Sequence, residues 1–226
     1  MDRAISGHAL NHRRGTAETS TLAPTTRERT IRIAVLVSGS GTNLQALIDH
    51  AGEASGYSIA IVVSDRHGVR ALDRARSAGM PTVVVEWSGD RREFTTGVCD
   101  AAAEAGADAL VLAGFMRILG PEALTRFPNR ILNIHPSLLP AFPGKTPVAD
   151  TLAHGVRVTG VTVHFIDERV DHGPIVSQES VMVEADDTEF TLHQRLHDLE
   201  HRLYPAAVSA MAQGRLRVEG RKVIWS

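Results

Sequence analysis

Apolar residues along this chain follow two alternating patterns. Short, nearly continuous apolar runs are typical of strands in a parallel sheet covered on both faces, and segments with apolar residues at helical spacing lie between them. The predicted strands cover residues 31–37, 57–64, 82–85, 109–112 and 130–135. The predicted helices start with Leu44, Leu47 and Ile48 and continue with 70–78, 91–105 and 122–127. Strands that alternate with helices predict βαβ units and a parallel, twisted sheet with helices on both faces.

The pattern changes after Pro140. It then predicts two strands, a long helix and a closing hairpin, over residues 157–165, 174–183, 188–213 and 216–225. Asp187 or Thr188 can cap the start of the long helix. We expect the two strands to extend the sheet in antiparallel fashion. The overall prediction is an α/β, Rossmann-like fold with a mostly parallel sheet and an antiparallel C-terminal addition.

Residues 1–29 lack this periodicity and are rich in Ser, Thr, Arg and His. Such a composition predicts a disordered, mobile tail that makes no contact with the core. One folded domain is expected to follow over residues 30–226. The chain of 226 residues is 43% hydrophobic, which is ample for one sizeable core.

Charge and cysteine content exclude several classes of protein. The net charge of −2 gives no basic field that would attract nucleic acid. No apolar run approaches the roughly 18 residues that a membrane span needs, and no apolar segment near the N-terminus marks a secretory signal. Cys99 is the only cysteine, so a disulfide framework is excluded and a packed thiol is expected. These features predict a soluble, cytoplasmic protein that binds neither nucleic acid nor membranes.

The strand that ends at His135 carries the first candidate site. Because side chains alternate along a strand, Asn133 and His135 point the same way. Pro136 has no N–H group and cannot continue a central ladder, so the strand ends there. An amide and an imidazole therefore lie at the carboxyl end of a strand, where open α/β sheets bind ligands. The alternative is a strand end with two satisfied polar residues.

A glycine-rich loop, Ser38-Gly39-Ser40-Gly41-Thr42-Asn43, follows the first strand. Glycines let backbone N–H groups approach an anion, and the next helix offers its positive end, so a phosphate is the expected ligand. Leu44 stands where a dinucleotide fingerprint needs its third glycine, and no Gly-Lys-Ser/Thr follows as in a Walker A loop. The alternative is a tight strand–helix turn without a ligand.

Asp171 lies in an acidic loop that ends in Gly173-Pro174. Such loops usually face water, but an acid at the mouth of the same sheet could orient His135 and keep it charged. A protonated His135 beside the amide of Asn133 would stabilise an oxyanion. This constellation suits attack of an amine on a carbonyl-type carbon.

Two further segments have both a functional and a plain interpretation. His193, His197 and His201 recur every four residues on the long helix, which suits either zinc or a solvated face. Without a supporting cysteine, we expect no metal. Met116 lies in an apolar loop after a buried strand, which is either a core connection or a slot for a flat ring at the carboxyl edge of the sheet.

Taken together, these motifs resemble the folate-dependent formyltransferases. The stretch from Asn133 to Pro140, followed by Asp171-x-Gly-Pro, carries the family resemblance. Segments 38–45 and 113–119 resemble the members that act on glycinamide ribonucleotide. The resemblance implies that residues 30–226 form a catalytic domain that transfers the formyl group of 10-formyltetrahydrofolate to the amine of 5-phosphoribosylglycinamide. This reaction belongs to purine synthesis.

The resemblance also implies roles for individual residues. It makes His135 the proton donor, Asn133 its oxyanion partner and Asp171 the group that keeps His135 protonated. The ribonucleotide would be held by Gly39, Ser40, Gly41, Thr42, Asn43 and Glu200. The folate would be held by Arg92, Met116, Arg117, Ile118, Leu119, Asn133 and Val170, with largely backbone contacts from 116 to 119. No metal is implied.

The sequence departs from the family pattern in two places. Lys145 and Thr146 follow a Phe-Pro-Gly turn after which relatives commonly carry a histidine, and His197 stands where some carry a glutamine. Both departures bear on substrate contacts. Two prolines within four residues, together with the resemblance, favour a cis peptide bond at Leu139-Pro140.

Two other functions remain open from the sequence. One is a hydrolase similar to formyltetrahydrofolate deformylase, and the other is a non-catalytic module that binds a phosphate or nucleotide. In each case the expected partners are small molecules, and the expected assembly is a monomer or a homodimer.

Overall fold

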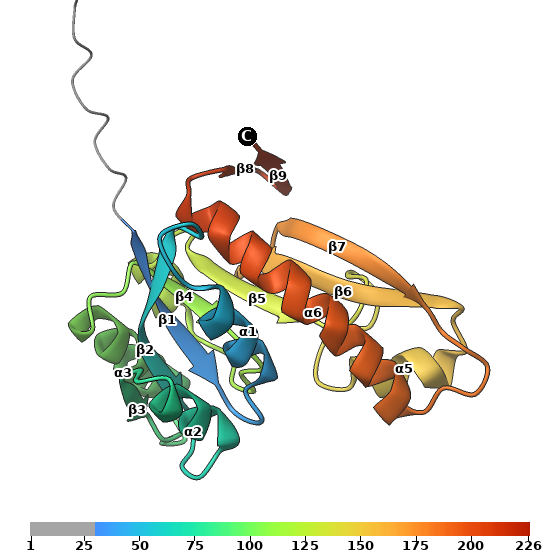
Figure 1. The fold of residues 1–226 in the computed structure, drawn as a ribbon, viewed down its shortest axis with the longest axis horizontal. Coiled ribbons are helices and arrows are strands. Elements are labelled where there is room, and N and C mark those ends of the chain that lie inside the picture. The colour runs from blue at the N-terminus through green and yellow to red at the C-terminus, as the bar shows by residue number, and fades with distance from the viewer. Residues whose placement is uncertain (1–29) are drawn as a thin grey trace, which may run out of the picture.

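The computed structural model describes residues 30–226, so the predicted tail over residues 1–29 lies outside the described residues. The described chain forms one nine-stranded sheet in the order β3-β2-β1-β4-β5-β6-β7-β9-β8 (Figure 1). The strands are β1 (Ile31–Val37), β2 (Tyr57–Ser64), β3 (Thr82–Val84), β4 (Ala109–Leu112), β5 (Ile131–His135), β6 (Val158–Phe165), β7 (Ile175–Met182), β8 (Leu216–Glu219) and β9 (Lys222–Trp225). The helices are α1 (Thr42–His50), α2 (Arg70–Ser77), α3 (Arg91–Glu104), α4 (Pro121–Arg126), α5 (Pro147–His154) and α6 (Glu189–Ala212).

Strand pairing confirms the predicted α/β architecture. Strands β1 to β5 pair in parallel, and β6 and β7 extend the sheet in antiparallel fashion. The closing hairpin pairs β8 with β9 and joins the sheet where Lys222 meets Ile175 of β7. Strands β2 and β3 lie on one side of β1, and β4 and β5 lie on the other. The crevice outside the carboxyl ends of β1 and β4 is therefore the switch point at which such sheets bind ligands.

Helices cover both faces of the sheet, and the side chains of β1 show why its sequence is apolar throughout. Ile33, Val35 and Val37 pack in one buried cluster with residues of α1, α2 and α6. Ala34 and Leu36 belong to a second buried cluster with residues of α3 and α4. The long helix α6 crosses the front of β5 and β6 (Figure 1). Within residues 30–226, no helix combines the length and the apolar character needed to cross a membrane.

Several local predictions are confirmed. Thr188, one of the two predicted caps, caps α6 in a capping box with Thr191. Helix α4 begins at Pro121, one residue before the predicted start. The Leu139-Pro140 bond is cis. Cys99 is fully buried, and this burial raises the pKa of its thiol to about 11, which fits a packed and unreactive side chain.

Helix α5 is absent from the prediction. It buries only Pro147, Val148 and Thr151 along its length. A single apolar pair at Val148 and Leu152 is too short a pattern to reveal a helix of eight residues. Proline at its first turn is the remaining signal, because proline is common at the start of helices.

Candidate active site

A cavity of about 560 Å³ opens at the carboxyl ends of β1, β4 and β5. Three segments that are far apart in the sequence meet on its wall, namely residues 38–43, 112–119 and 133–136. The loop after β6 and the first half of α6 close the remaining sides. Its volume is in the range of small-molecule sites, and topology therefore brings the predicted phosphate loop, ring slot and strand end to one place.

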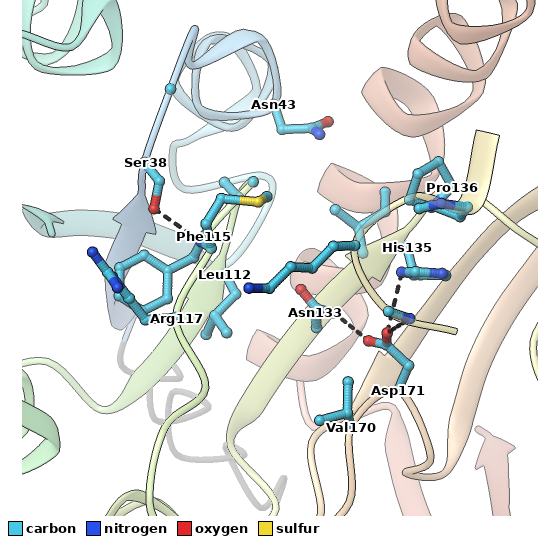
Figure 2. Close-up of a pocket in the computed structure, with 18 of the residues that line it drawn as sticks. Ser38, Asn43, Leu112, Phe115, Arg117, Asn133, His135, Pro136, Val170 and Asp171 are labelled. Atoms are coloured by element: carbon cyan, nitrogen blue, oxygen red, sulfur yellow. Dashed lines mark hydrogen bonds and ion pairs between the residues drawn. The ribbon is translucent and has the colours of Figure 1, made fainter. Parts of the chain in front are cut away.

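Asp171 lies between two histidines at the end of this cavity. The register of β5 and β6 places Asn133 directly opposite His164, and His135 points the same way. The carboxylate of Asp171 lies 3.5 Å from Nδ1 of His135 and 3.6 Å from Nε2 of His164 (Figure 2). The backbone N–H of Gly144 donates to the same carboxylate at 2.8 Å. The expected pairing of Asp171 with His135 is thus present in the folded chain.

The protonation of His135 differs from the expectation. Burial of the ring lowers the pKa of His135, whereas Asp171 and the backbone carbonyl of Phe142 raise it, and burial prevails. The folded chain therefore holds the pKa of His135 below its ordinary value, so Asp171 does not by itself keep this ring charged at neutral pH. Nε2 of His135 lies 2.8 Å from the carbonyl oxygen of Phe142, which can only accept, so Nε2 carries a proton.

Asp171 itself remains anionic. Burial raises the pKa of Asp171, but the hydrogen bond from His164, the charge of His135 and the N–H of Gly144 together hold it below its ordinary value. A buried anion beside an imidazole favours the cationic form of that ring. The carboxylate therefore makes protonation of His135 easier than burial alone would allow.

The side-chain nitrogen of Asn133 faces protein groups rather than the open cavity. It lies 3.2 Å from Nε2 of His164 and 3.4 Å from a carboxylate oxygen of Asp171. In this arrangement Asn133 fixes the carboxylate. A role as oxyanion donor requires its amide to turn, and the broad terminal torsion of asparagine permits this movement.

His164 is a site residue that the sequence reading missed. Its Nδ1 lies 2.9 Å from the carbonyl oxygen of Phe165, and its ring is almost fully buried. The available signal was strand alternation, because Val163 and Phe165 face the core and His164 must therefore face the other way.

The predicted phosphate loop lines the cavity from Ser38 to Asn43. Gly41 precedes α1 with φ of 74°, a left-handed conformation that favours glycine. The amide nitrogen of Asn43 donates to Glu200 at 2.8 Å, and its buried Oδ1 has no hydrogen-bond partner within the described residues. A buried acceptor without a partner beside a helix N-terminus indicates a ligand that brings its own donor.

Three large apolar side chains on the wall of the cavity are unusually exposed. Met116, Ile118 and Val170 are each about half exposed, although all three are large apolar side chains. Among residues 30–226, no protein group hydrogen-bonds to the backbone of Arg117 or Ile118. Exposed apolar side chains next to unused backbone donors and acceptors suit a flat, polar-edged ring.

The side chain of Arg117 makes contacts within the protein and does not point into the cavity. Its guanidinium bonds the fully buried carboxylate of Asp65 at 2.9 Å and lies over the ring of Trp87. In Figure 2 this side chain points away from Asn133. Any contact of Arg117 with a ligand would therefore come from its backbone, as the resemblance implies.

The structure places Arg91, rather than the predicted Arg92, on the wall of the cavity. Arg91 donates to the carbonyl oxygen of Leu119 at 3.1 Å. The side chain of Arg92 is 83% exposed and pairs with Glu122 at 3.5 Å. Consecutive residues on a helix point about 100° apart, so only one of the two arginines can face the cavity from the start of α3.

Comparison with known proteins identifies the family and the fold. The sequence pattern of a family described as formyl transferase matches residues 31–208. The chain belongs to the formyl transferase family. The resemblance inferred from the motifs is confirmed at this level, and so is the fold.

Full-length relatives of this formyltransferase are similar over most of their length. A phosphoribosylglycinamide formyltransferase of Mycobacterium tuberculosis is 45% identical over 201 residues, which cover 85% of this chain and 93% of that protein. The crystal structure of glycinamide ribonucleotide transformylase 1 from Symbiobacterium toebii matches with a TM-score of 0.85 at 44% identity, and covers 92% of this chain and 99% of that one.

Two other relatives are similar over only part of their length. The trifunctional purine biosynthetic protein adenosine-3 of Gallus gallus is 44% identical over 199 residues, which are 86% of this chain and 20% of that protein. The chain thus spans between 14% and 20% of the length of the trifunctional relatives. A formyltetrahydrofolate deformylase from Pseudomonas syringae has a TM-score of 0.81 at 25% identity, over 88% of this chain and 67% of that one.

The two departures from the family pattern both lie on the cavity of this formyltransferase. Lys145, Thr146 and His197 line it. His193 and His197 have ring centroids 4.0 Å apart, and burial with the charges of its neighbours lowers the pKa of His197 to about 4. Within residues 30–226, no set of three or more His, Cys, Asp or Glu side chains is arranged to hold a metal ion.

Glu200 is the most strongly perturbed acid of the formyltransferase site. Burial raises the pKa of Glu200 to about 7, and the hydrogen bond from Asn43 opposes this effect without cancelling it. In the folded protein Glu200 therefore keeps a proton that the unfolded chain releases near its ordinary pKa. The folded state binds more protons than the unfolded state across this window, so stability from this group falls as pH rises from about 5 to 8.

Replacing Glu200 by Gln should remove this pH dependence. The Tm of Glu200→Gln minus the Tm of the parent is expected to increase by roughly 4–8 °C from pH 5 to pH 8. Thermal unfolding in phosphate-free buffer at the two pH values measures it. Glu184→Gln, at a carboxylate that is 63% exposed, is the control. A difference that is independent of pH would mean that Glu200 ionises at its ordinary pKa.

Proposed function

We propose that this protein transfers the formyl group of 10-formyltetrahydrofolate to the amine of 5-phosphoribosylglycinamide, a step of purine synthesis. The observation that carries the proposal is the buried Asp171–His135 pair, which shares one cavity with the candidate phosphate loop and the exposed apolar residues. The M. tuberculosis relative named for this reaction aligns along nearly its whole length. A family of enzymes also favours catalysis over a non-catalytic binding module.

The two ends of the cavity suit the two substrates. The phosphate of the ribonucleotide would meet the N–H groups of residues 39–43 and the positive end of α1. Oδ1 of Asn43 and the protonated Glu200 would meet the hydroxyl or amide groups of the same substrate. The pterin ring would lie on Met116, Ile118 and Val170, with its polar edge against the free backbone of residues 117–118.

The chemistry requires one acid at the formyl group. The amine nitrogen attacks the formyl carbon, and the formyl oxygen gains negative charge in a tetrahedral intermediate. The cationic form of His135 donates a proton to this oxygen, and its lowered pKa makes it a stronger acid. The oxygen then returns its proton to His135 as the carbonyl re-forms and the carbon–nitrogen bond to the folate breaks. Over the whole reaction the amine nitrogen loses a proton and the folate nitrogen gains one. Asp171 favours the cationic form of His135 and offers an acceptor for the proton in transit.

An absorbance assay of tetrahydrofolate release tests this function. Release is expected only when both 10-formyltetrahydrofolate and glycinamide ribonucleotide are present. Release without the ribonucleotide would instead indicate a deformylase. Binding of both substrates without release would indicate the non-catalytic module, and either result would overturn the proposal.

A further inference from the structure

Asp167 forms hydrogen bonds with two other residues of the loop that carries Asp171. One carboxylate oxygen of Asp167 accepts the backbone N–H of Arg169 at 2.9 Å, and the other lies 2.6 Å from Nδ1 of His172. Gly173 then passes so close to β6 that a Cβ atom there would lie 1.8 Å from the carbonyl oxygen of Phe165. The loop is therefore fixed immediately before and after Asp171.

Asp171 itself has an uncommon backbone conformation. Its φ is 49°, in the left-handed region, which costs an L-residue about 1–2 kcal/mol. Such a conformation persists only where the surrounding contacts impose it. On the cavity side, the N–H of Gly144 holds the carboxylate. On the side away from the cavity, the backbone is held by the contacts of the next residue, His172.

Arg221, in the turn between β8 and β9, makes those contacts. Its guanidinium donates to the backbone carbonyl of His172 at 2.8 Å and lies 3.2 Å from the ring nitrogens of the same residue. Because Nδ1 of His172 points its proton at Asp167, the lone pair of Nε2 accepts from Arg221. The side chains of Arg221, His172 and Asp167 thus form one chain of hydrogen bonds, here termed the Arg221 clamp.

The hairpin that presents Arg221 is itself anchored to the sheet. Lys222 pairs with Ile175 at the start of β7. The indole N–H of Trp225 donates to the carbonyl oxygen of Val176 at 2.9 Å. Both contacts lie just beyond the acidic loop in the sequence, so the hairpin is held at the outer end of this loop. Figure 1 shows β8 and β9 beside the start of β7.

We propose that Arg221 is a positioning residue, which holds the acidic loop through the Arg221 clamp so that Asp171 stays beside His135. The inference rests on the proposed function for the reaction that Asp171 serves. Without the clamp, Asp171 can leave its left-handed conformation, and its carboxylate moves away from the imidazole. The attraction between the two groups falls with distance, so the cationic form of His135 becomes rarer.

The test compares Arg221→Ala with Arg217→Ala in the full chain. Arg217 lies on β8 of the same hairpin and pairs with Glu219 instead of the acidic loop. NMR titration of the His135 ring measures the first readout, and its pKa should fall further in Arg221→Ala than in Arg217→Ala. The titratable groups that face His135 are Asp171 and His164, and these are common to all variants.

Turnover provides the second readout. Arg221→Ala should lower kcat by roughly 5- to 20-fold, because small misplacements of a supporting group are costly in the transition state. KM for the ribonucleotide should stay unchanged, since residues 38–43 do not contact the clamp. Arg221→Lys should fall between the two, because one ammonium group cannot contact both the carbonyl and the ring of His172.

The possible outcomes separate this inference from the proposed function. Unchanged titration of His135 in Arg221→Ala would overturn the clamp, whether or not kcat falls. If the pKa of His135 is lower in Arg221→Ala than in Arg217→Ala but the parent protein shows no formyl transfer, the clamp is supported and the proposed reaction is rejected. If Arg221→Ala fails to fold, Arg221→Gln takes its place, because it keeps one donor for the carbonyl of His172 and loses the charge.

Discussion

Replacing Asp171 by Asn should lower kcat for formyl transfer by about 10²- to 10⁴-fold, with only modest changes in KM. Asparagine keeps the shape of the side chain and tolerates the left-handed backbone at this position. The negative charge beside His135 is lost. Burial is then opposed only by the carbonyl of Phe142, so the pKa of the imidazole falls further and its cationic form becomes rarer at neutral pH. Steady-state kinetics with both substrates varied measures the effect.

His135→Asn should reduce kcat at least as far, and the double variant should lose far less than the product of the two single effects. Such non-additivity is expected when two groups act as a unit. Glu168→Gln, in the same loop, removes a charge that does not lie beside His135 and serves as the control. If Asp171→Asn kept nearly full kcat while His135→Asn were inactive, Asp171 would have no part in the proton transfer.

Gly41→Val should impair the ribonucleotide site more than any other single change in the phosphate loop. A Cβ atom at residue 41 would lie 2.6 Å from Cα of Ala71, and the left-handed φ of 74° is strained for any side chain. The loop must therefore shift away from α2, which moves its N–H groups from the phosphate. The Kd for the ribonucleotide is expected to rise at least about 10-fold, with that for a folate analogue within about 2-fold. Calorimetric titration measures both.

A second glycine separates binding from folding in this experiment. Gly39 has open space where its Cβ would be, so Gly39→Ala should leave Tm unchanged. Gly41→Val should lower the free energy of unfolding by about 1–3 kcal/mol, because the added side chain displaces α2. Equal weakening of ribonucleotide and folate binding in Gly41→Val would show that the loop is a structural turn rather than a phosphate site.

Most of the fold follows from the sequence because its signals are local. The near-continuous apolar run of β1 reflects burial on both faces, and helix ends carry their own markers, such as Pro121 and Thr188. The boundaries of the predicted elements differ from the observed ones by only a residue or two. Helix α5 was not predicted because it buries only Pro147, Val148 and Thr151, which do not form an extended apolar pattern at helical spacing.

The site was predictable in its location and less so in its electrostatics. Parallel topology alone brings the ends of β1, β4 and β5 together, so the three candidate segments had to meet. The lowered pKa of His135 depends on burial and on the carbonyl of Phe142, neither of which appears in a sequence pattern. The choice between Arg91 and Arg92 depends on the rotation of α3 about its axis, which is fixed by packing rather than by spacing.

The fate of the formyl carbon distinguishes transfer to the ribonucleotide from hydrolysis to formate. The full chain is incubated with 10-formyltetrahydrofolate labelled with carbon-13 in the formyl group and with glycinamide ribonucleotide, and the label is followed by NMR. Formyl transfer with Asp171 beside His135 predicts that the label appears in an N-formyl amide of the ribonucleotide, and that this signal forms far more slowly with Asp171→Asn. Label that accumulates as free formate, at the same rate with or without the ribonucleotide, would contradict this function.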